Sequence, residues 1–195
     1  MRNRTGKSAF SVKELAIIAF FTSLTAVLAQ IAIPIPFSPV PISFGLVAVY
    51  ISAILLKPKH AIYSQVCYLI IGMMGVPVFA GFRGGMGVLF GPTGGYLLSY
   101  PLMAWIVAMA LNSQKSLSAE QRQSKGIIFL KSALAMCIAL IVCYTAGTIW
   151  LSFTTGNTFY AALAIAVLPF IPMDILKILF CVFAIIPIRS RLSIQ

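Results

Sequence analysis

Six long apolar runs, separated by short polar stretches, constrain this chain more than any other feature. They cover approximately residues 15–33, 41–56, 61–80, 88–111, 127–153 and 159–188. A helix that crosses a bilayer needs about 20 apolar residues, so most of these runs have the length of one span. Only 9% of the 195 residues are charged, too few for the polar surface of a soluble domain of this size. The pattern predicts an integral membrane protein.

The last run is too long for one span, and Pro169 and Pro172 divide it. Proline interrupts a helix interior but is accepted in a first turn, so we place the final helix after a partly apolar loop or re-entrant segment. The expected fold class is all-α, a single six-helix membrane domain over residues 1–195. The six spans are expected at about 15–33, 41–56, 61–80, 92–111, 127–153 and 172–188.

The basic residues indicate an orientation in the membrane. If the N-terminus is cytoplasmic, 12 of the 14 Lys and Arg residues fall on the cytoplasmic side, and only Arg83 and Lys177 remain for the outer half. Cytoplasmic loops carry an excess of Lys and Arg, so both termini are expected in the cytoplasm. The basic start and the Val27-x-Ala29 pair also fit a cleaved signal peptide, which would leave five spans.

Several function classes lack their usual signals. The net charge of +11 is spread over the ends of apolar runs and forms no basic face, so no nucleic-acid partner is expected. The four cysteines lie in apolar runs without a CxxC pair, and His60 is the only histidine, so no metal site is expected. The glycine-rich segment lacks the lysine of a GxxxxGK[ST] phosphate-binding loop.

Two outer loops differ sharply in stiffness. "IPIPFSPVPIS" (33–43) has a proline every two or three residues, which fixes an extended chain. "GFRGGMGVLFGPTGGY" (81–96) is rich in glycine, which lets backbone N–H groups approach a ligand closely. The two loops could roof a pocket, or they could be tight connections between helices.

The segment "PMDILK" (172–177) contains the only acidic residue deep in the apolar half of the chain. Asp174 and Lys177 are three residues apart and share one helix face, and Pro172 at the first helical position would put Asp174 in the first turn. Charges inside a membrane are costly and usually functional. The alternative is a salt bridge that only tolerates burial.

The first apolar run carries a narrow stripe of small residues. Ala16, Ala19, Ser23 and Ala26 are spaced three, four and three residues apart, so they share one helix face. Small residues let another helix approach closely in lipid. The partner helix could belong to a second protein or to this bundle.

These motifs together resemble the BioY family. The likeness rests on "IPIPFSPVPIS", "GVPVFAGFRGGMGVLFGPTGGYLLSYP", "GTIWLSF" and "PMDILK", and it runs from the first helix to the last. The resemblance implies the biotin-specific S component of an energy-coupling factor (ECF) transporter in the bacterial cell membrane. It implies a transmembrane coupling protein and two ATP-binding-cassette ATPases as partners. ATP would be used by those ATPases, and this chain would need no cofactor besides its ligand, biotin.

The resemblance also implies roles for particular residues. Asp174 and Lys177 match the family's acidic-x-x-basic pair, which faces biotin. The small-residue stripe is where S components meet the coupling protein, although the family's Ala-x-x-x-Ala is Ala19-x-x-x-Ser23 here. Candidates for the apolar wall of the pocket are Phe79, Tyr96 and Trp150.

Recognition of the biotin carboxylate is expected to depend on the glycine-rich loop. Many relatives have glutamine at the position of Gly45 and some have arginine at that of Leu97, so this chain lacks both donors. Arg83, with nearby backbone N–H groups at Gly84 and Gly85, is the remaining candidate. Arg83 could instead point into solvent.

Three other functions stay open. One is an S component for another vitamin. Another is an intramembrane enzyme that uses Asp174, although the sequence shows no second carboxylate, histidine base or serine–lysine dyad placed for catalysis. The third is transport by this protein alone, without the ATPases.

Overall fold

The computed structural model describes residues 11–112 and 125–189, and nearly all regular structure within them is helical. The elements in chain order are α1 (Val12–Gln30), β1 (Ala32–Ile33), β2 (Ile42–Ser43), α2 (Gly45–Leu55), α3 (Pro58–Met73), α4 (Met86–Phe90), α5 (Gly94–Leu98), α6 (Tyr100–Asn112), α7 (Lys125–Thr155), α8 (Phe159–Ala166), α9 (Ile171–Phe180), a π-helical turn (Cys181–Ile185) and α10 (Ile186–Arg189).

Local sequence signals explain where several helices begin. The Ser11 hydroxyl accepts from the Glu14 backbone N–H while the Glu14 carboxylate accepts from the Ser11 N–H, a capping box that starts α1. Pro58 opens α3, and Pro172 lies in the first turn of α9, where proline removes no helical hydrogen bond. Thr158 caps α8 by accepting from the Ala161 N–H.

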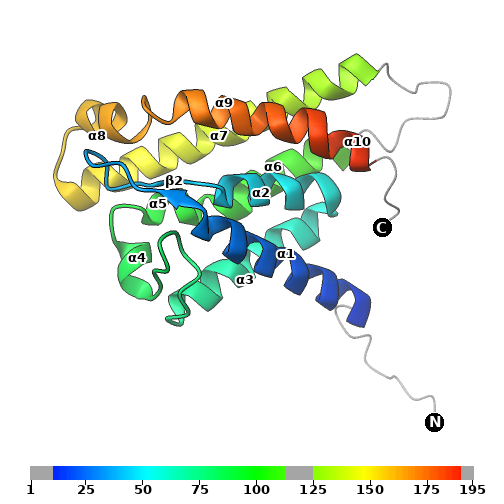
Figure 1. The fold of residues 1–195 in the computed structure, drawn as a ribbon, viewed down its shortest axis with the longest axis horizontal. Helices are drawn as coiled ribbons and strands as arrows, with labels where there is room; N and C mark the ends of the chain where they lie inside the picture. Colours follow the sequence, from blue (N-terminus) through cyan, green and yellow to red (C-terminus); the bar gives the residue numbers. More distant parts are fainter. Residues whose placement is uncertain (1–10, 113–124, 190–195) are drawn as a thin grey trace, which may run out of the picture.

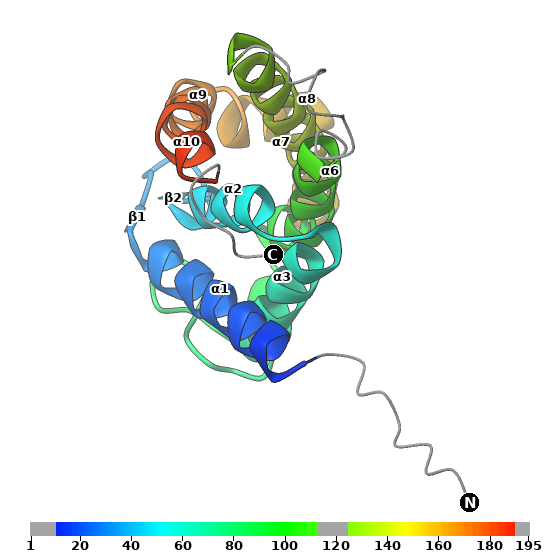
Figure 2. The ribbon, with the colours of Figure 1, turned by 90° about the vertical axis from the view of Figure 1, so that its right-hand side faces the viewer.

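α2 lies at the centre of the bundle. Figure 2 shows α2 surrounded by α1, α3, α6, α7, α9 and α10. Its residues Ala48, Val49 and Tyr50 are fully buried, so α2 is apolar on every side. A helix that is apolar all round belongs in the interior of a bundle.

The outward faces of the other helices are also apolar. Phe20 and Val27 of α1, Leu130 and Ile141 of α7 and Phe183 near the chain's end are each more than 60% exposed. Within residues 11–112 and 125–189, four helical stretches are long and apolar enough to cross a bilayer: Val12–Gln30, Gly94–Asn112, Gly126–Thr155 and Ile171–Arg189. An apolar exterior around an apolar core is what a lipid environment requires.

The structure refines the sequence-based boundaries at several points. The expected spans 41–56 and 61–80 correspond to the shorter helices Gly45–Leu55 and Pro58–Met73, and residues 92–111 to the successive helices α5 and α6. The helix expected at 172–188 continues through a π-helical turn to Arg189. The described part of the chain also departs from an all-α fold, since β1 and β2 pair antiparallel and close the proline-rich loop at its base. Prolines lack the N–H that a longer ladder would need.

The bundle has two distinct ends. One end of the bundle, toward the right in Figure 1, contains the starts of α1, α3 and α7 and the ends of α2 and α10. We call it the helix-terminal end. The proline-rich loop, α4, α5 and α8 lie toward the left, which we call the loop end. The two unusual loops are thus brought to the same end of the molecule.

Candidate functional site

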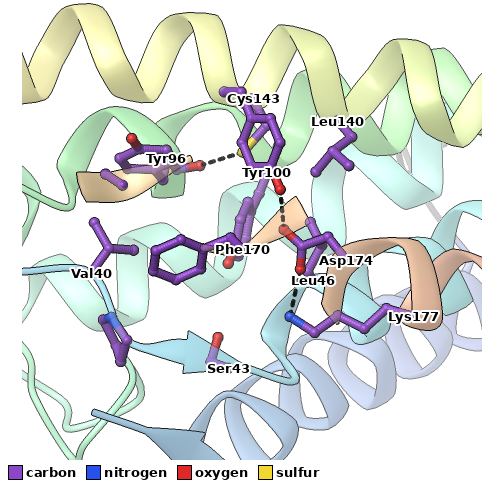
Figure 3. Close-up of a pocket in the computed structure, with 13 residues that line it drawn as sticks. Val40, Ser43, Leu46, Tyr96, Tyr100, Leu140, Cys143, Phe170, Asp174 and Lys177 are labelled. Atoms are coloured by element: carbon purple, nitrogen blue, oxygen red, sulfur yellow. Dashed lines mark hydrogen bonds and ion pairs between the residues drawn. The ribbon is translucent and has the colours of Figure 1, made fainter. Parts of the chain in front are cut away.

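Asp174 and Lys177 form a buried ion pair on α9. The Lys177 Nζ donates to the Asp174 Oδ1 at 2.7 Å, and the residues are only 6% and 4% exposed, respectively. Asp174 lies in the first turn of the helix, where the dipole favours a carboxylate. Both residues line a hollow. Figure 3 shows the two side chains joined to each other at the wall of this hollow. The pair neutralises its own charge while keeping polar atoms at the wall of this hollow, which we call the helical hollow.

The rest of the helical hollow is largely apolar and aromatic. Its walls come from the proline-rich loop, α2, α5, α6, α7 and α8 as well as α9. Lining residues beyond the pair include Val40, Ser43, Tyr100, Leu140, Cys143 and Phe170. Figure 3 shows Tyr96, Tyr100 and Phe170 around the same space. A concave apolar surface with a few convergent polar groups is the usual form of a small-molecule site.

A third polar residue contacts the pair from another helix. The Tyr144 hydroxyl on α7 donates to the Asp174 Oδ2 at 2.6 Å, so each carboxylate oxygen accepts from one side chain. Sequence analysis did not select Tyr144. One feature of the sequence could have identified it. Tyr144 is a phenol in the middle of an apolar span, and a buried tyrosine hydroxyl normally requires a hydrogen-bond partner.

Tyr96 is the one residue of the expected aromatic wall that lines the helical hollow. Its ring packs against Gly147 of α7 so closely that a Cβ at Gly147 would overlap the ring atoms. Its hydroxyl lies 3.5 Å from the Thr148 Oγ1. The glycine in "GTIWLSF" therefore permits α5 to approach α7 closely, and this approach positions Tyr96.

Phe79 and Trp150 pack elsewhere in the structure and are not among the residues that line the helical hollow. Phe79 is 1% exposed and meets Tyr68 edge to face, with ring centroids 5.5 Å apart. The Trp150 Nε1 donates to the Gly91 carbonyl at 2.9 Å, and its side chain packs over Gly95. Both aromatic residues hold the glycine-rich segment against the helices.

Arg83 lies on an exposed hairpin at the loop end. Its backbone pairs with that of Phe79 through two hydrogen bonds, of 2.9 and 3.2 Å. The Arg83 Nε donates to the Ala80 carbonyl at 3.1 Å, and the side chain is exposed. Gly81 and Phe82, with φ of 73° and 56°, form the reverse turn of this hairpin.

Arg83 lines a second hollow between the two loops, which we call the loop hollow. Ala80 and Gly81 join it from the glycine-rich side, and Pro34, Ile35, Ser38 and Pro39 from the proline-rich side. Pro41 lines both hollows, so the two are neighbours. The stiff loop and the pliable loop therefore face each other across a recess that adjoins the helical hollow.

Gly84 and Gly85 have structural roles in this loop. The Gly85 N–H donates to the Gly72 carbonyl at 2.7 Å, and Gly85 has a φ of 91° that L-residues rarely adopt. A Cβ at Gly84 would collide with the Val76 carbonyl. In this conformation the Gly85 N–H is therefore already used within the protein.

Gln30, the last residue of α1, ties the glycine-rich loop to the bundle. Its Nε2 donates to the Val78 carbonyl at 2.9 Å, and its Oε1 accepts from the Phe82 N–H at 2.9 Å. One side chain thus joins the first arm of the hairpin that carries Arg83 to the turn of the same hairpin. Gln30 was not among the residues predicted for the site, because nothing in the sequence shows that its amide reaches residues about 50 positions away.

The small-residue stripe lies largely on the outside of the bundle. Ala16, Ala19 and Ser23 are exposed, while Ala26 is half-buried against the core. The opposite face of α1 packs inward through Ile18, Phe21, Thr22, Thr25 and Ala29. Most of the stripe is therefore not used for packing within this chain.

Comparison with known proteins gives a consistent result. The sequence pattern of the BioY family matches residues 1–194. A probable biotin transporter BioY of Pyrococcus horikoshii is 34% identical over 165 residues, which cover 85% of this chain and 89% of that protein. The biotin transporter BioY2 of Lactococcus lactis subsp. cremoris is 34% identical over 178 residues, 90% of each chain.

A solved structure resembles this chain in fold as well as in sequence. The crystal structure of an S-component for biotin from an ECF-type ABC transporter superposes with a TM-score of 0.79 at 28% identity, covering 92% of both chains. The match extends over nearly the whole of this multi-pass, mostly helical membrane protein. The chain belongs to the BioY family.

Proposed function

We propose that this chain is the biotin-binding S component of an ECF-type vitamin transporter. The observation that carries the proposal is the buried Asp174–Lys177 pair at the wall of an otherwise apolar and aromatic hollow. Similarity to proteins described as biotin transporters supports the choice of ligand. Membership of this family makes the chain a transport protein and not an enzyme.

The chemistry of the pair suits the head group of biotin. The ureido ring carries two N–H donors and one strong carbonyl acceptor. A carboxylate only accepts and an ammonium only donates, so Asp174 takes a ureido N–H and Lys177 donates to the carbonyl. The apolar remainder of the hollow accommodates the sulfur-containing ring, with Tyr96 as part of its wall.

The loop hollow suits the other end of the ligand. The valerate chain of biotin ends in a carboxylate, and Arg83 is the one basic residue among those that line this hollow. A guanidinium pairs with a carboxylate in a planar, often bidentate arrangement. In our proposal biotin lies with its ureido ring at Asp174 and its carboxylate toward Arg83, passing Pro41, which borders both hollows.

The same proposal assigns six spans and an orientation. α1, α2, α3, α5 with α6, α7, and α9 with α10 would each cross the bilayer, with both termini in the cytoplasm of a bacterial cell. The positions of the described basic residues support this. Lys13, Lys57, Lys59 and Lys131 lie near the starts of α1, α3 and α7, and Arg189 ends α10. Figure 1 shows these helix ends together at the helix-terminal end, opposite the loop end, and cytoplasmic segments carry an excess of basic residues. Biotin would then enter from outside.

The proposed partners are a transmembrane coupling protein and two ATP-binding-cassette ATPases. The exposed stripe of Ala16, Ala19 and Ser23 gives a smooth helix face on which another membrane helix can pack closely. In this scheme the ATPases use ATP, and this chain supplies only the vitamin site.

Calorimetric titration of the purified chain in detergent tests the proposed ligand. We expect biotin to bind with one-to-one stoichiometry, and thiamine and riboflavin not to compete. Binding of another vitamin in preference to biotin would make the chain an S component of different specificity. Absence of biotin binding by a folded preparation would overturn the proposal.

Cysteine labelling in intact cells tests the orientation separately. In a background without the four native cysteines, a cysteine placed between residues 113 and 124 should resist a membrane-impermeant thiol reagent, and one at Gly81 should react. The reverse pattern would invert the topology.

A further inference from the structure

A cluster of polar side chains lies buried where α1, α2 and α3 meet. Each of its five members is at most 5% exposed: Thr22 and Thr25 of α1, Ser52 of α2, and Ser64 and Gln65 of α3. None of the five is among the residues that line either hollow. The Gln65 Nε2 lies 3.1–3.3 Å from the hydroxyl oxygens of Thr25, Ser52 and Ser64, so Gln65 joins all three helices. We call this cluster the polar node.

The hydroxyl groups of the polar node are paired within their own helices. Each one donates to a carbonyl three or four positions earlier in the same helix, at 2.7 to 2.9 Å. Thr22 also shares its proton with the Ser64 carbonyl of α3. Thr22 and Thr25 therefore keep a hydrogen-bond partner within α1 when α1 changes its position against α3. Movement of α1 leaves neither of these buried hydroxyls unpaired.

Gln65 is the member of the node whose hydrogen bonds are not matched. Its amide has two protons for three neighbouring acceptors, whereas its Oε1 is buried without a partner in the described part of the chain. Exchanging the amide oxygen and nitrogen would leave the nitrogen unpaired instead. An unpaired buried polar atom is costly. A small shift of α1 along α3 would let the Thr25 hydroxyl turn from its own helix to the Oε1 and remove this cost.

α1 is also the least buried of the long helices. Among the described stretches that could cross a bilayer, the share of buried residues is 28% in α1 and 33% to 56% in the others, and Figure 2 shows α1 at the edge of the bundle. Its first turn meets α3 where the Glu14 Oε1 lies 3.2 Å from the His60 Nε2. Its last residue, Gln30, is bonded to the glycine-rich hairpin. A shift of α1 would therefore move the hairpin that carries Arg83.

We propose that α1 shifts against α2 and α3, that Gln65 permits this shift, and that Gln30 transmits it to the Arg83 hairpin. In one position the Gln65 Nε2 donates to the Thr25 hydroxyl, as in this structure. In the other position the Gln65 Oε1 accepts the Thr25 proton, and the hairpin is displaced with the end of α1. The displacement changes the loop hollow, because the hairpin forms one side of it. The link to ligand release rests on the proposed function.

Spin-label distances test the shift without any ligand. In a background without the four native cysteines, labels at the exposed positions Val27 of α1 and Ile141 of α7 report where α1 lies. We expect two populations of distances in the parent and one in Gln65→Met, because methionine has a similar length but no amide that can exchange partners. A single population in the parent would overturn the proposal, and so would two unchanged populations in Gln65→Met.

Thermal unfolding tests whether the Gln65 amide destabilises the resting structure, and it needs no cysteine substitution. Gln65→Met should raise the unfolding midpoint by roughly 2–4 °C, since it removes an unpaired buried acceptor. The matched control is Ser132→Ala on α7, whose buried hydroxyl donates to the Ile128 carbonyl of its own helix but lies outside the node. We expect this control not to raise the midpoint. A lower midpoint for Gln65→Met would make Gln65 a structural contact and contradict the proposal.

The rate of biotin dissociation tests the role of Gln30. Gln65→Met should slow dissociation about threefold, the factor that corresponds to one interhelical hydrogen bond in a membrane protein, because the hairpin no longer moves with α1. In a Gln30→Leu background the same substitution should leave the rate unchanged. An equal slowing in both backgrounds would contradict transmission through Gln30. If the parent binds no biotin, the proposed function fails, while the spin-label distances still decide whether α1 shifts.

Discussion

The helical hollow and the glycine-rich hairpin hold their charged side chains in opposite surroundings. Asp174 and Lys177 lie on one helix, buried and joined to each other, with Tyr144 holding the carboxylate from α7. Arg83 lies on an exposed hairpin shaped by backbone hydrogen bonds and by Gln30. A buried polar group that is already in position contributes strongly to affinity, because a ligand that does not pair with it leaves the group without a hydrogen-bond partner. An exposed arginine is screened by water and contributes less. Because its hairpin lies at the surface, we expect the hairpin to affect the rate of ligand release more than the affinity.

The largest expected effect on affinity comes from the buried pair. Asp174→Asn should weaken biotin binding by about 1.5–3 kcal/mol, the range for hydrogen bonds to charged groups. Asparagine has the size of aspartate but can turn an N–H toward the ligand's own donor, and it leaves Lys177 without its ion pair. Titration calorimetry measures the change, and Glu14→Gln at the start of α1 is the control carboxylate. An unchanged affinity for Asp174→Asn would make the pair purely structural.

Arg83→Ala should have a smaller effect that depends on the charge of the ligand. We expect a loss of about 1 kcal/mol for biotin, the upper range for an exposed ion pair, and almost none for biotin methyl ester. The control is Lys59→Ala, which removes an exposed cation at the helix-terminal end. Equal losses for biotin and its ester would mean that Arg83 shapes the hairpin without reading the carboxylate. No loss for either ligand would place Arg83 outside the site.

Gln30→Leu should act mainly on kinetics. Loss of its hydrogen bonds to Val78 and Phe82 releases one attachment of the hairpin, which we expect to raise the dissociation rate of biotin roughly twofold, or about 0.5 kcal/mol. Stopped-flow displacement measures this rate. Phe82→Ala keeps the backbone N–H that Gln30 accepts and is the control. If Gln30→Leu leaves the dissociation rate unchanged, the hairpin does not control release.

The stripe on α1 should have the smallest effect on affinity and a large one on assembly. Ser23→Leu should leave biotin affinity unchanged, because Ser23 is exposed, but it should block close packing of a partner helix. Co-purification with the coupling protein and ATPases measures the loss, and Ser23→Ala should assemble normally. Full assembly of Ser23→Leu would exclude this face as the contact, and a changed biotin affinity would show that the stripe belongs to the bundle.

Particular residues show how far the sequence could be interpreted. The ion pair between Asp174 and Lys177 was predictable, because charges in an apolar run are rare and because their spacing gives a shared helix face. Tyr96 was selected through its motif and lines the hollow. Phe79 and Trp150, selected for the same wall, instead pack against the glycine-rich segment, since the direction of an aromatic side chain depends on neighbours that local sequence does not specify.

The amino-acid sequence by itself determined that the chain is a helical membrane protein, and which charged residues are candidates for its site. Apolar length, proline positions and helical spacing are local properties, and they are sufficient for these conclusions. Only the tertiary structure decided that Tyr144 donates to Asp174 and that Gln30 holds the Arg83 hairpin. It also decided that the two loops share a recess bordered by Pro41. The physical reason is that these contacts join residues about 30 to 50 positions apart. Their geometry is set by how closely the helices pack, as where Gly147 admits the ring of Tyr96.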